Sequence, residues 1–255
     1  MRTPRSVRRG VLAVALLAAM PGLTLATLAP GSSDGIRRVV IGRSVRGRQI
    51  VADVIGPASA PRKVLVVGCI HGNECAGLAI ANALMRQPVV RGVQLWIVPE
   101  MNPDGTVANT RQNAHGVDLN RNFPYRWQKN TNPVYDSGPR PFSEPESRAA
   151  AALIRLVRPT ATVWYHQHED LVDMAGGDRG IARRYARVAK LRATCLPFLP
   201  GTATDWSNHT FPGTTSFVVE LPAGRVTRAA LGRHLAAVAG VEAGLRIGAP
   251  SRCAP

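Results

Sequence analysis

Residues 64–86 read VLVVGCIHGNECAGLAIANALMR, an apolar run that passes through a short polar turn into a second apolar segment. The run 64–67 is aliphatic and mostly β-branched, which predicts a strand buried on both faces. Small and apolar residues follow from 76 to 86, and they predict a helix. This strand–turn–helix unit is typical of sheets that are covered by helices.

Similar elements continue on both sides of this stretch. Short β-rich runs predict further strands at 37–43, 49–55, 93–98, 160–165 and 215–221. Helices are expected at 181–191 and 227–245, and a capping box at 143–146 predicts one that runs to about Val157. The alternation predicts an α/β fold, a single domain with a mixed β-sheet flanked by helices on both faces.

The segment 101–140 is rich in Asn, Pro, Gly and Arg, and we expect a long ordered loop there. Loops of that length inside compact domains usually carry function. In sheets of this kind, sites form beyond the strand ends. Candidate functional residues are therefore sought in this loop and at the ends of the predicted strands.

The first 29 residues predict an export signal. Four arginines and no acid precede Val11, an apolar run follows, and small residues lie near 26–29. Pro21 and Gly22 interrupt the apolar run, so it is too short for a typical membrane-spanning helix. We expect residues 1–29 to be removed and residues 30–255 to act outside the cytoplasm near the cell wall, without stable membrane insertion. A retained anchor is the alternative, and the choice between Sec and twin-arginine export stays open.

The chain is strongly basic. Its 255 residues carry 32 Lys+Arg against 16 Asp+Glu, a formal net charge of +16 at pH 7. Removal of the four arginines in residues 1–29 lowers this charge to +12. A basic chain suggests a nucleic-acid partner, but no nucleic-acid motif is present and few aromatic residues lie among the arginines. We interpret the excess charge as compositional and expect no nucleic-acid partner.

Cys69, Cys75, Cys195 and Cys253 allow three complete pairings. Export permits disulfides, and a bond between Cys195 and Cys253 would attach the C-terminal tail to the domain. Cys69 and Cys75 lie in an apolar strand-to-helix junction, where we expect buried free thiols. The full pairing stays open at this point.

The turn after the strand at 64–67 carries His71 and Glu74, three residues apart. An imidazole nitrogen and a carboxylate are two of the three protein ligands in a His₂Glu catalytic zinc site. His166 ends an apolar run and is the candidate third ligand. His168, two residues on, is either a nearby polar contact or a solvated loop histidine, and we favour the latter. An ordinary polar turn is the alternative for the pair.

Glu220 ends the apolar run at 215–221, where an unpaired carboxylate is costly. Beside a metal, such a group is suited to act as a general base, and a salt-bridged structural glutamate is the alternative. Arg111 and Arg121 form a fork suited to carboxylates or oxyanions, unless they are ordinary surface arginines. Asp118 lies between them and can orient a metal-bound histidine.

Taken in order, these motifs resemble the zinc metallocarboxypeptidase family, the carboxypeptidase A-like group, and within it short bacterial members of the murein peptide amidase type. The resemblance covers most of residues 62–225. Its motifs are GCIHGNE at 68–74, NPDG at 102–105, DLNRN at 118–122, SEPE at 143–146, WYHQ at 164–167, GTATDW at 201–206 and VELP at 219–222.

The resemblance implies a carboxypeptidase-like fold and one zinc ion per chain. It makes His71, Glu74 and His166 the zinc ligands and Glu220 the base that activates water. It also places Arg111 at the oxyanion that develops on the scissile carbonyl.

The resemblance further assigns residues to substrate binding. Asn120 and Arg121 would hold the substrate's terminal carboxylate, Asp118 would support His71, and Thr204 would lie at the base of the pocket for the C-terminal side chain. Digestive members of the family carry a mobile tyrosine upstream of the Asp-Trp pair, whereas residues 194–204 contain none here.

We therefore expect a secreted zinc carboxypeptidase that hydrolyses an amide bond next to a free C-terminal carboxylate, with murein peptides as candidate substrates. An N-acyl amino acid deacylase of the succinylglutamate desuccinylase/aspartoacylase type is the alternative enzyme. A catalytically silent module that binds anionic polymers is the third interpretation. Substrate stereochemistry and oligomeric state stay open.

Overall fold

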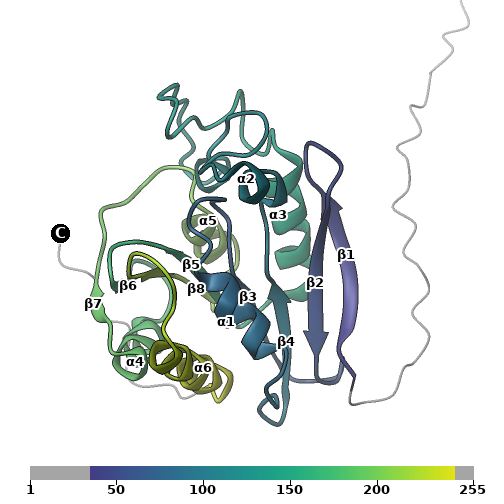
Figure 1. Ribbon diagram of the computed structural model, residues 1–255, viewed down its shortest axis with the longest axis vertical. Helices are drawn as coiled ribbons and strands as arrows, with labels where there is room; N and C mark the ends of the chain where they lie inside the picture. The colour runs from purple at the N-terminus through teal and green to yellow at the C-terminus, as the bar shows by residue number, and fades with distance from the viewer. Residues whose placement is uncertain (1–34, 245–255) are drawn as a thin grey trace, which may run out of the picture. The chain divides into compact units, whose positions relative to one another are not determined.

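A mixed eight-stranded sheet is the central layer of the computed structural model, which describes residues 35–244 (Figure 1). The strand order is β1-β2-β4-β3-β5-β8-β6-β7. The strands are β1 (Arg37–Arg43), β2 (Gln49–Ile55), β3 (Arg62–Val67), β4 (Val93–Val98), β5 (Ala161–Gln167), β6 (Leu171–Asp173), β7 (Arg192–Thr194) and β8 (Thr215–Leu221). The proposed export signal at 1–29 and Cys253 lie outside the described residues.

Parallel pairing in the middle of the sheet determines which strand ends meet. β3 pairs in parallel with β4 and with β5, and β5 pairs in parallel with β8. The pairs β1–β2, β2–β4 and β6–β8 are antiparallel, while β6 and β7 are parallel. Because β3, β5 and β8 run in the same direction, their carboxyl ends share one edge of the sheet, the edge where sites form in such folds.

Helices cover both faces of the sheet, as the sequence predicts (Figure 1). The described helices are α1 (Gly77–Leu84), α2 (Pro103–Ala108), the short 3₁₀ helix η1 (Leu119–Arg121), α3 (Pro145–Val157), α4 (Arg179–Ala189), α5 (Ala203–Thr210) and α6 (Arg228–Glu242). Val66 and Val163 face a core shared with α1, α4 and α6. Their neighbours Leu65 and Trp164 face a second core with α3 and α5. Successive strand residues point to opposite faces, so the central strands must be apolar throughout.

The predicted fold class is confirmed, and β1, β2, β4 and β8 have the predicted bounds. Five elements were not predicted: β6, β7, α2, η1 and α5. The two strands are three residues long, too short to show a period in sequence. The segment 101–140 is also not a continuous loop, because it contains α2 and η1. Asn102 caps α2 by accepting a hydrogen bond from the N–H of Gly105 at 2.9 Å.

The capping box predicted at 143–146 is wrong, although the helix that it predicts is present. α3 begins at Pro145, and no side chain caps its first turn. Glu144 and Glu146 instead accept hydrogen bonds from Nδ2 of Asn113, at 2.8 and 3.0 Å. An unpaired buried carboxylate costs more than a missing cap, so the tertiary contacts take these side chains.

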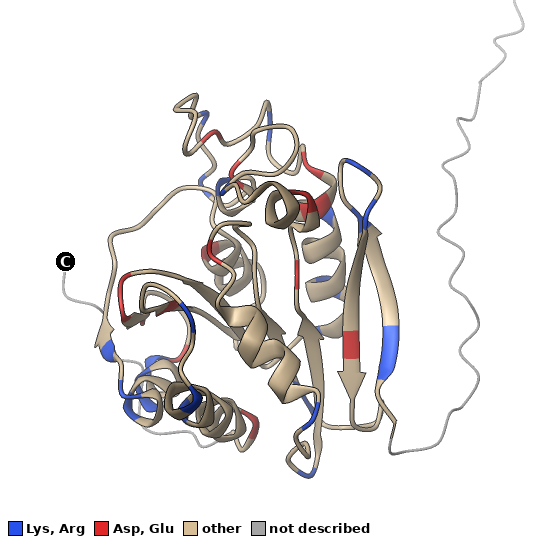
Figure 2. Ribbon diagram, viewed as in Figure 1, with Lys and Arg blue, Asp and Glu red and all other residues tan. Residues whose placement is uncertain are grey.

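Basic residues are spread over many elements of the described chain. Figure 2 shows Lys and Arg on β1, in the turn between β1 and β2, on α3 and on α4. This distribution agrees with a compositional origin of the net charge. A search of the described helices finds none that is long and apolar enough to cross a membrane.

Candidate active site

The carboxyl edge of the sheet brings the candidate site residues together. His71 and Glu74 lie in the turn after β3, and His166 lies next to the last residue of β5. Glu220 lies next to the last residue of β8, and the register of the β5–β8 pair places it opposite His166. Parallel strands thus align side chains that are far apart in sequence.

Two glycines allow the turn after β3 to pack closely against its neighbours. A Cβ atom at Gly77 would collide with the carbonyl oxygen of Gly68 and with the side chain of Tyr165. A Cβ atom at Gly72 would collide with the backbone of Gly105 in α2. Larger residues would push the turn away from β5 and α2, and the candidate ligands would move with it.

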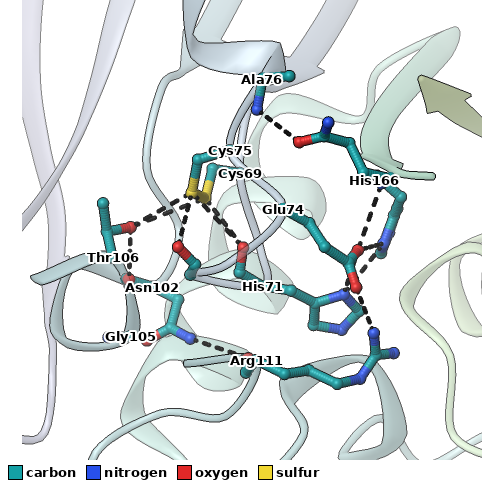
Figure 3. The surroundings of a disulfide bond; sticks show 12 residues. Cys69, His71, Glu74, Cys75, Ala76, Asn102, Gly105, Thr106, Arg111 and His166 are labelled. Atoms are coloured by element: carbon teal, nitrogen blue, oxygen red, sulfur yellow. Dashed lines mark hydrogen bonds and ion pairs between the residues drawn. A yellow bond between two sulfur atoms is a disulfide. The ribbon is translucent and has the colours of Figure 1, made fainter. Parts of the chain in front are cut away.

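Three side chains at this edge form a donor set for a metal ion (Figure 3). One donor atom each from His71, Glu74 and His166 lies within 4.8 Å of the other two. The Nδ1 atoms of the histidines lie 2.9 and 3.2 Å from Oε2 of Glu74, and 3.1 Å from each other. Two imidazoles and one carboxylate are the protein ligands of a catalytic zinc site with an open fourth position, so the residues fit zinc.

The protonation states of two of these ligands, His166 and Glu74, also suit a metal. Burial lowers the pKa of His166 to about 4, which keeps the ring neutral near pH 7. Burial opposes ionisation of Glu74, but hydrogen bonds from His166 and His71 outweigh it and hold the pKa of this carboxyl well below its usual range. A neutral imidazole and an ionised carboxylate are the forms that bind metals.

Asp118 contacts His71 from the side away from Glu74. Nε2 of His71 lies 2.9 Å from Oδ1 of Asp118, and Oδ2 accepts a hydrogen bond from Nε of Arg111 at 2.9 Å. Burial disfavours the charged carboxyl, but His71 and Arg111 outweigh this and hold the pKa of Asp118 well below its usual range. A carboxylate on the far nitrogen orients a metal-binding imidazole, which is the role predicted for Asp118.

Glu220 has a buried oxygen without a partner. Within the described part of the chain, Oε2 of Glu220 has no hydrogen-bond partner. Burial, followed by the charges of Glu74 and Glu169, raises the pKa of Glu220 to about 7. A carboxylate balanced near neutral pH beside a metal-binding set is suited to accept and return a proton.

Arg111 and Arg121 place positive charge beside the donor set and Glu220. Arg111 donates Nη1–H to Oε1 of Glu74 in addition to its bond with Asp118. Arg121 donates Nη1–H to the carbonyl of Asn120 at 2.8 Å, and no ion pair is recorded for it among residues 35–244. Burial, together with the nearby charge of Arg111, lowers the pKa of Arg121. A partly buried guanidinium with unpaired N–H groups is a receptor for a carboxylate.

Asn120 and Thr204 add polar groups without charge. Oδ1 of Asn120 accepts a hydrogen bond from the N–H of Ala203 at 2.9 Å, which connects η1 to the start of α5. The amide NH₂ of Asn120 is then the group left for a ligand. Thr204 lies in the first turn of α5 and is buried.

A single cleft of about 860 Å³ collects most of the residues singled out from the sequence. Its lining includes Glu74, Arg111, Asn120, Arg121, His166, Thr204 and Glu220. His71 and Asp118 are absent from the lining, because both side chains are fully buried next to it. The structure therefore brings all the candidates to one place, and their individual roles stay predictions.

Other residues of the cleft were not singled out from the sequence. Tyr135 lies in the segment between η1 and α3, and its ring faces both arginines of the cleft. The only available signal was an isolated aromatic residue in a polar, proline-containing loop. His168, interpreted as a solvated loop histidine, is exposed and lines the cleft.

The expectation of free thiols at Cys69 and Cys75 is wrong. These residues form a disulfide, with Cα atoms 4.9 Å apart, a normal separation for such a bond (Figure 3). The turn that includes the hydrogen bond from the N–H of Glu74 to the carbonyl of His71 brings the two cysteines together. An apolar junction in the sequence did not reveal that the chain reverses there. The disulfide encloses two of the three candidate metal ligands.

We expect the disulfide to strengthen metal binding, because it limits the conformations of the turn that carries His71 and Glu74. Replacing both Cys69 and Cys75 by Ser should weaken zinc binding about tenfold, the lower end of the effect of supporting residues around metal ligands. Competition with a chromophoric chelator measures the affinity. Circular dichroism of the metal-free double variant checks that the fold is retained. An unchanged zinc affinity would contradict this prediction.

Cys195 is also disulfide-bonded. The partner predicted for it, Cys253, lies outside the described residues. The expectation that a bond attaches the C-terminal tail to the domain therefore stays a prediction.

Comparison with known proteins places this geometry in context. A family profile described as zinc carboxypeptidase matches residues 24–186, a region that includes all the candidate site residues except Thr204 and Glu220. Murein peptide amidase A from Escherichia coli K12 is 32% identical over 138 residues, which are 49% of this chain and 57% of that enzyme. The chain thus matches somewhat more than half the length of this curated relative.

Solved structures share the fold. The crystal structure of murein-tripeptide amidase from Escherichia coli O157 has a TM-score of 0.66 and 25% identity, and the match covers 82% of this chain and 93% of that one. Carboxypeptidase A from Helicoverpa armigera has a TM-score of 0.71 at 20% identity, over 82% of this chain and 68% of that one. The second likeness concerns the fold alone.

Proposed function

This chain belongs to the zinc carboxypeptidase family, and we propose that it is a zinc-dependent peptidase that cleaves an amide bond next to a free terminal carboxylate. The proposal rests on the residues that meet at one cleft. A His₂Glu donor set and a partly buried Glu220 with an unpartnered oxygen suit hydrolysis, and the partly buried guanidinium of Arg121 suits a carboxylate.

In the proposed mechanism, His71, Glu74 and His166 would hold a zinc ion. Zinc in such a site supplies Lewis-acid chemistry, which polarises a carbonyl and lowers the pKa of water. Glu220 accepts the proton of the attacking water and returns it to the leaving nitrogen. Arg111 donates an N–H to the carbonyl oxygen as negative charge develops on it.

The terminal carboxylate of the substrate would bind to Arg121 and to the amide NH₂ of Asn120. A guanidinium and an amide together can donate to both carboxylate oxygens. Binding there fixes the end of the peptide, so the bond next to it is the one presented to Glu220 and the metal ligands. A peptide with an amidated terminus lacks this charge and should bind more weakly.

We further propose that the substrates are murein peptides and that the protein is exported. The likeness to murein peptide amidase A supports the first point, and the basic and apolar segment at 1–29 supports the second. The charge of +12 that remains without that segment also suits residence near an anionic cell wall.

A substrate comparison tests the proposal. The zinc-loaded full chain is incubated with L-Ala-γ-D-Glu-diaminopimelate, with ordinary L-tripeptides, and with N-acetyl and N-succinyl amino acids. Mass spectrometry then identifies the bond that breaks. We expect free diaminopimelate. Cleavage of L-tripeptides alone would retain the peptidase and reject the murein substrate, whereas release of only acetate or succinate would support a deacylase instead.

The state of Glu220 predicts a pH dependence. A general base must be ionised, so kcat/KM should fall as the pH drops through the pKa of Glu220. Burial raises this pKa to about 7 without metal, and the charge of zinc lowers it, so we expect the fall on the acid side of pH 7. Rates measured from pH 4 to 9 test this. A profile that is flat through the acid range would contradict a role for Glu220 as the base.

A further inference from the structure

One aromatic ring faces both guanidinium groups of the cleft. The centroid of the Tyr135 ring lies 5.3 Å from Cζ of Arg111 and 5.7 Å from Cζ of Arg121. A guanidinium within about 6 Å of a ring centroid is attracted by the negative face of the ring. Among the described residues that line the cleft, Tyr135 is the only tyrosine.

The loop that carries Tyr135 is connected to the segment that carries Arg111. Nε2 of Gln112 donates hydrogen bonds to the two carbonyls that directly precede Tyr135, at 2.9 and 2.8 Å. Directly after Tyr135 in the chain, the carbonyl of Asp136 accepts a hydrogen bond from the N–H of Asp118 at 2.7 Å. The backbone is therefore held both before and after Tyr135, so the position of the ring follows from the arrangement of the arginine segment.

The ring solves a problem that the two arginines create. Two like charges in one partly buried cleft repel each other. Arg111 is already held by Glu74 and Asp118, whereas Arg121 has no ion pair among residues 35–244 and needs a partner that leaves its N–H groups available for substrate. A carboxylate partner would consume the donors of Arg121. An aromatic face attracts the cation without accepting its N–H hydrogen bonds, so the donors stay directed to the cleft.

We propose that Tyr135 is a positioning residue, whose ring face holds Arg121 beside Arg111 in the arrangement in which Arg121 receives the terminal carboxylate of the peptide. This inference rests on the proposed function. Tyr135 is 41% exposed and lines the cleft together with both arginines.

Variants of one loop test the proposal. We compare the parent with Tyr135→Phe, Tyr135→Ala and Val134→Ala. Val134→Ala is the control, because Val134 is exposed in the same loop and does not line the cleft. Each is titrated by calorimetry, in a Glu220→Gln background that prevents turnover, with the diaminopimelate tripeptide and an L-tripeptide. Both peptides are used with a free terminal α-carboxylate and as the terminal amide. KM and kcat are measured separately with Glu220 present.

We expect Tyr135→Ala to weaken binding of the free-carboxylate peptide about tenfold and to leave binding of the amide unchanged. KM should rise by a similar factor with kcat nearly constant. Tyr135→Phe keeps the ring and should match the parent, as should Val134→Ala. Melting temperatures verify that all variants are folded.

Other outcomes overturn the inference in distinguishable ways. If the parent prefers the carboxylate and Tyr135→Ala keeps that preference in full, the positioning role is wrong and the proposed function stands. If Tyr135→Phe loses as much as Tyr135→Ala, the hydroxyl group rather than the ring face acts, which also overturns the proposal. If the parent itself does not distinguish acid from amide, carboxylate recognition and the inference fail together.

Discussion

Replacing Glu220 by Gln is expected to lower the rate of hydrolysis about 10³-fold or more, while zinc stays bound. General acid–base catalysis contributes about 10²–10⁴-fold to enzymatic rates, and within residues 35–244 the other carboxylates that contact the metal-binding histidines already have partners. Glu74 is hydrogen-bonded to His71 and His166. Asp118 is hydrogen-bonded to His71 and Arg111. Gln has the same shape as Glu but accepts no proton near neutral pH. Steady-state rates and metal analysis of the same sample provide the measurement.

The melting temperature of Glu220→Gln distinguishes loss of the catalytic base from misfolding. Burial raises the pKa of Glu220, so the ionised side chain destabilises the folded protein at and above neutral pH. Glu220→Gln should therefore have a melting temperature at least equal to that of the parent at pH 8. Glu169→Gln is the matched control, because Glu169 is an exposed acid that lines the same cleft. A Glu220→Gln variant as active as the parent would overturn the mechanism.

Replacing Arg111 by Gln is expected to lower kcat by about 10²–10³-fold, the usual effect of losing one donor to a developing oxyanion. Its charge matters most when negative charge forms on the carbonyl oxygen, so kcat should fall more than KM rises. Single-turnover rates on a cleavable peptide measure this effect.

Arg111 also contacts Glu74 and Asp118, so the metal site needs its own check. Zinc content and zinc affinity of the variant should stay close to those of the parent if the loss is catalytic. Arg91→Gln, at an exposed arginine between α1 and β4, is the control for removal of a positive charge. Loss of zinc in step with loss of rate would contradict the oxyanion role and show that Arg111 mainly supports the ligands.

Most of the fold could be predicted because its signals are local. The central strands are apolar throughout, since each is packed on both faces, and polar residues interrupt this pattern where the strands end. His71, His166 and Glu220 stood out for that reason. β6 and β7 escaped prediction because three residues show no period, and the sheet itself holds them in place.

The predictions that were wrong concern residues whose partners are distant in sequence, or residues that a turn of the chain brings together. SEPE at 143–146 has the pattern of a capping box, yet Asn113, about thirty residues earlier, takes both of its carboxylates. Cys69 and Cys75 lie in a run that reads as apolar packing, yet the turn places them within disulfide distance.

The sequence by itself determined most of the strands and helices, the donor types at the strand ends and the family of the chain. These depend on hydrophobic period and residue chemistry, which are properties of short segments. Only the tertiary structure decided that one oxygen of Glu220 is buried without a partner, that Arg121 lies partly buried with no ion pair within residues 35–244, and that Tyr135 faces both arginines. Desolvation and charge pairing depend on distances between segments that the parallel sheet brings together, and no local pattern records those distances.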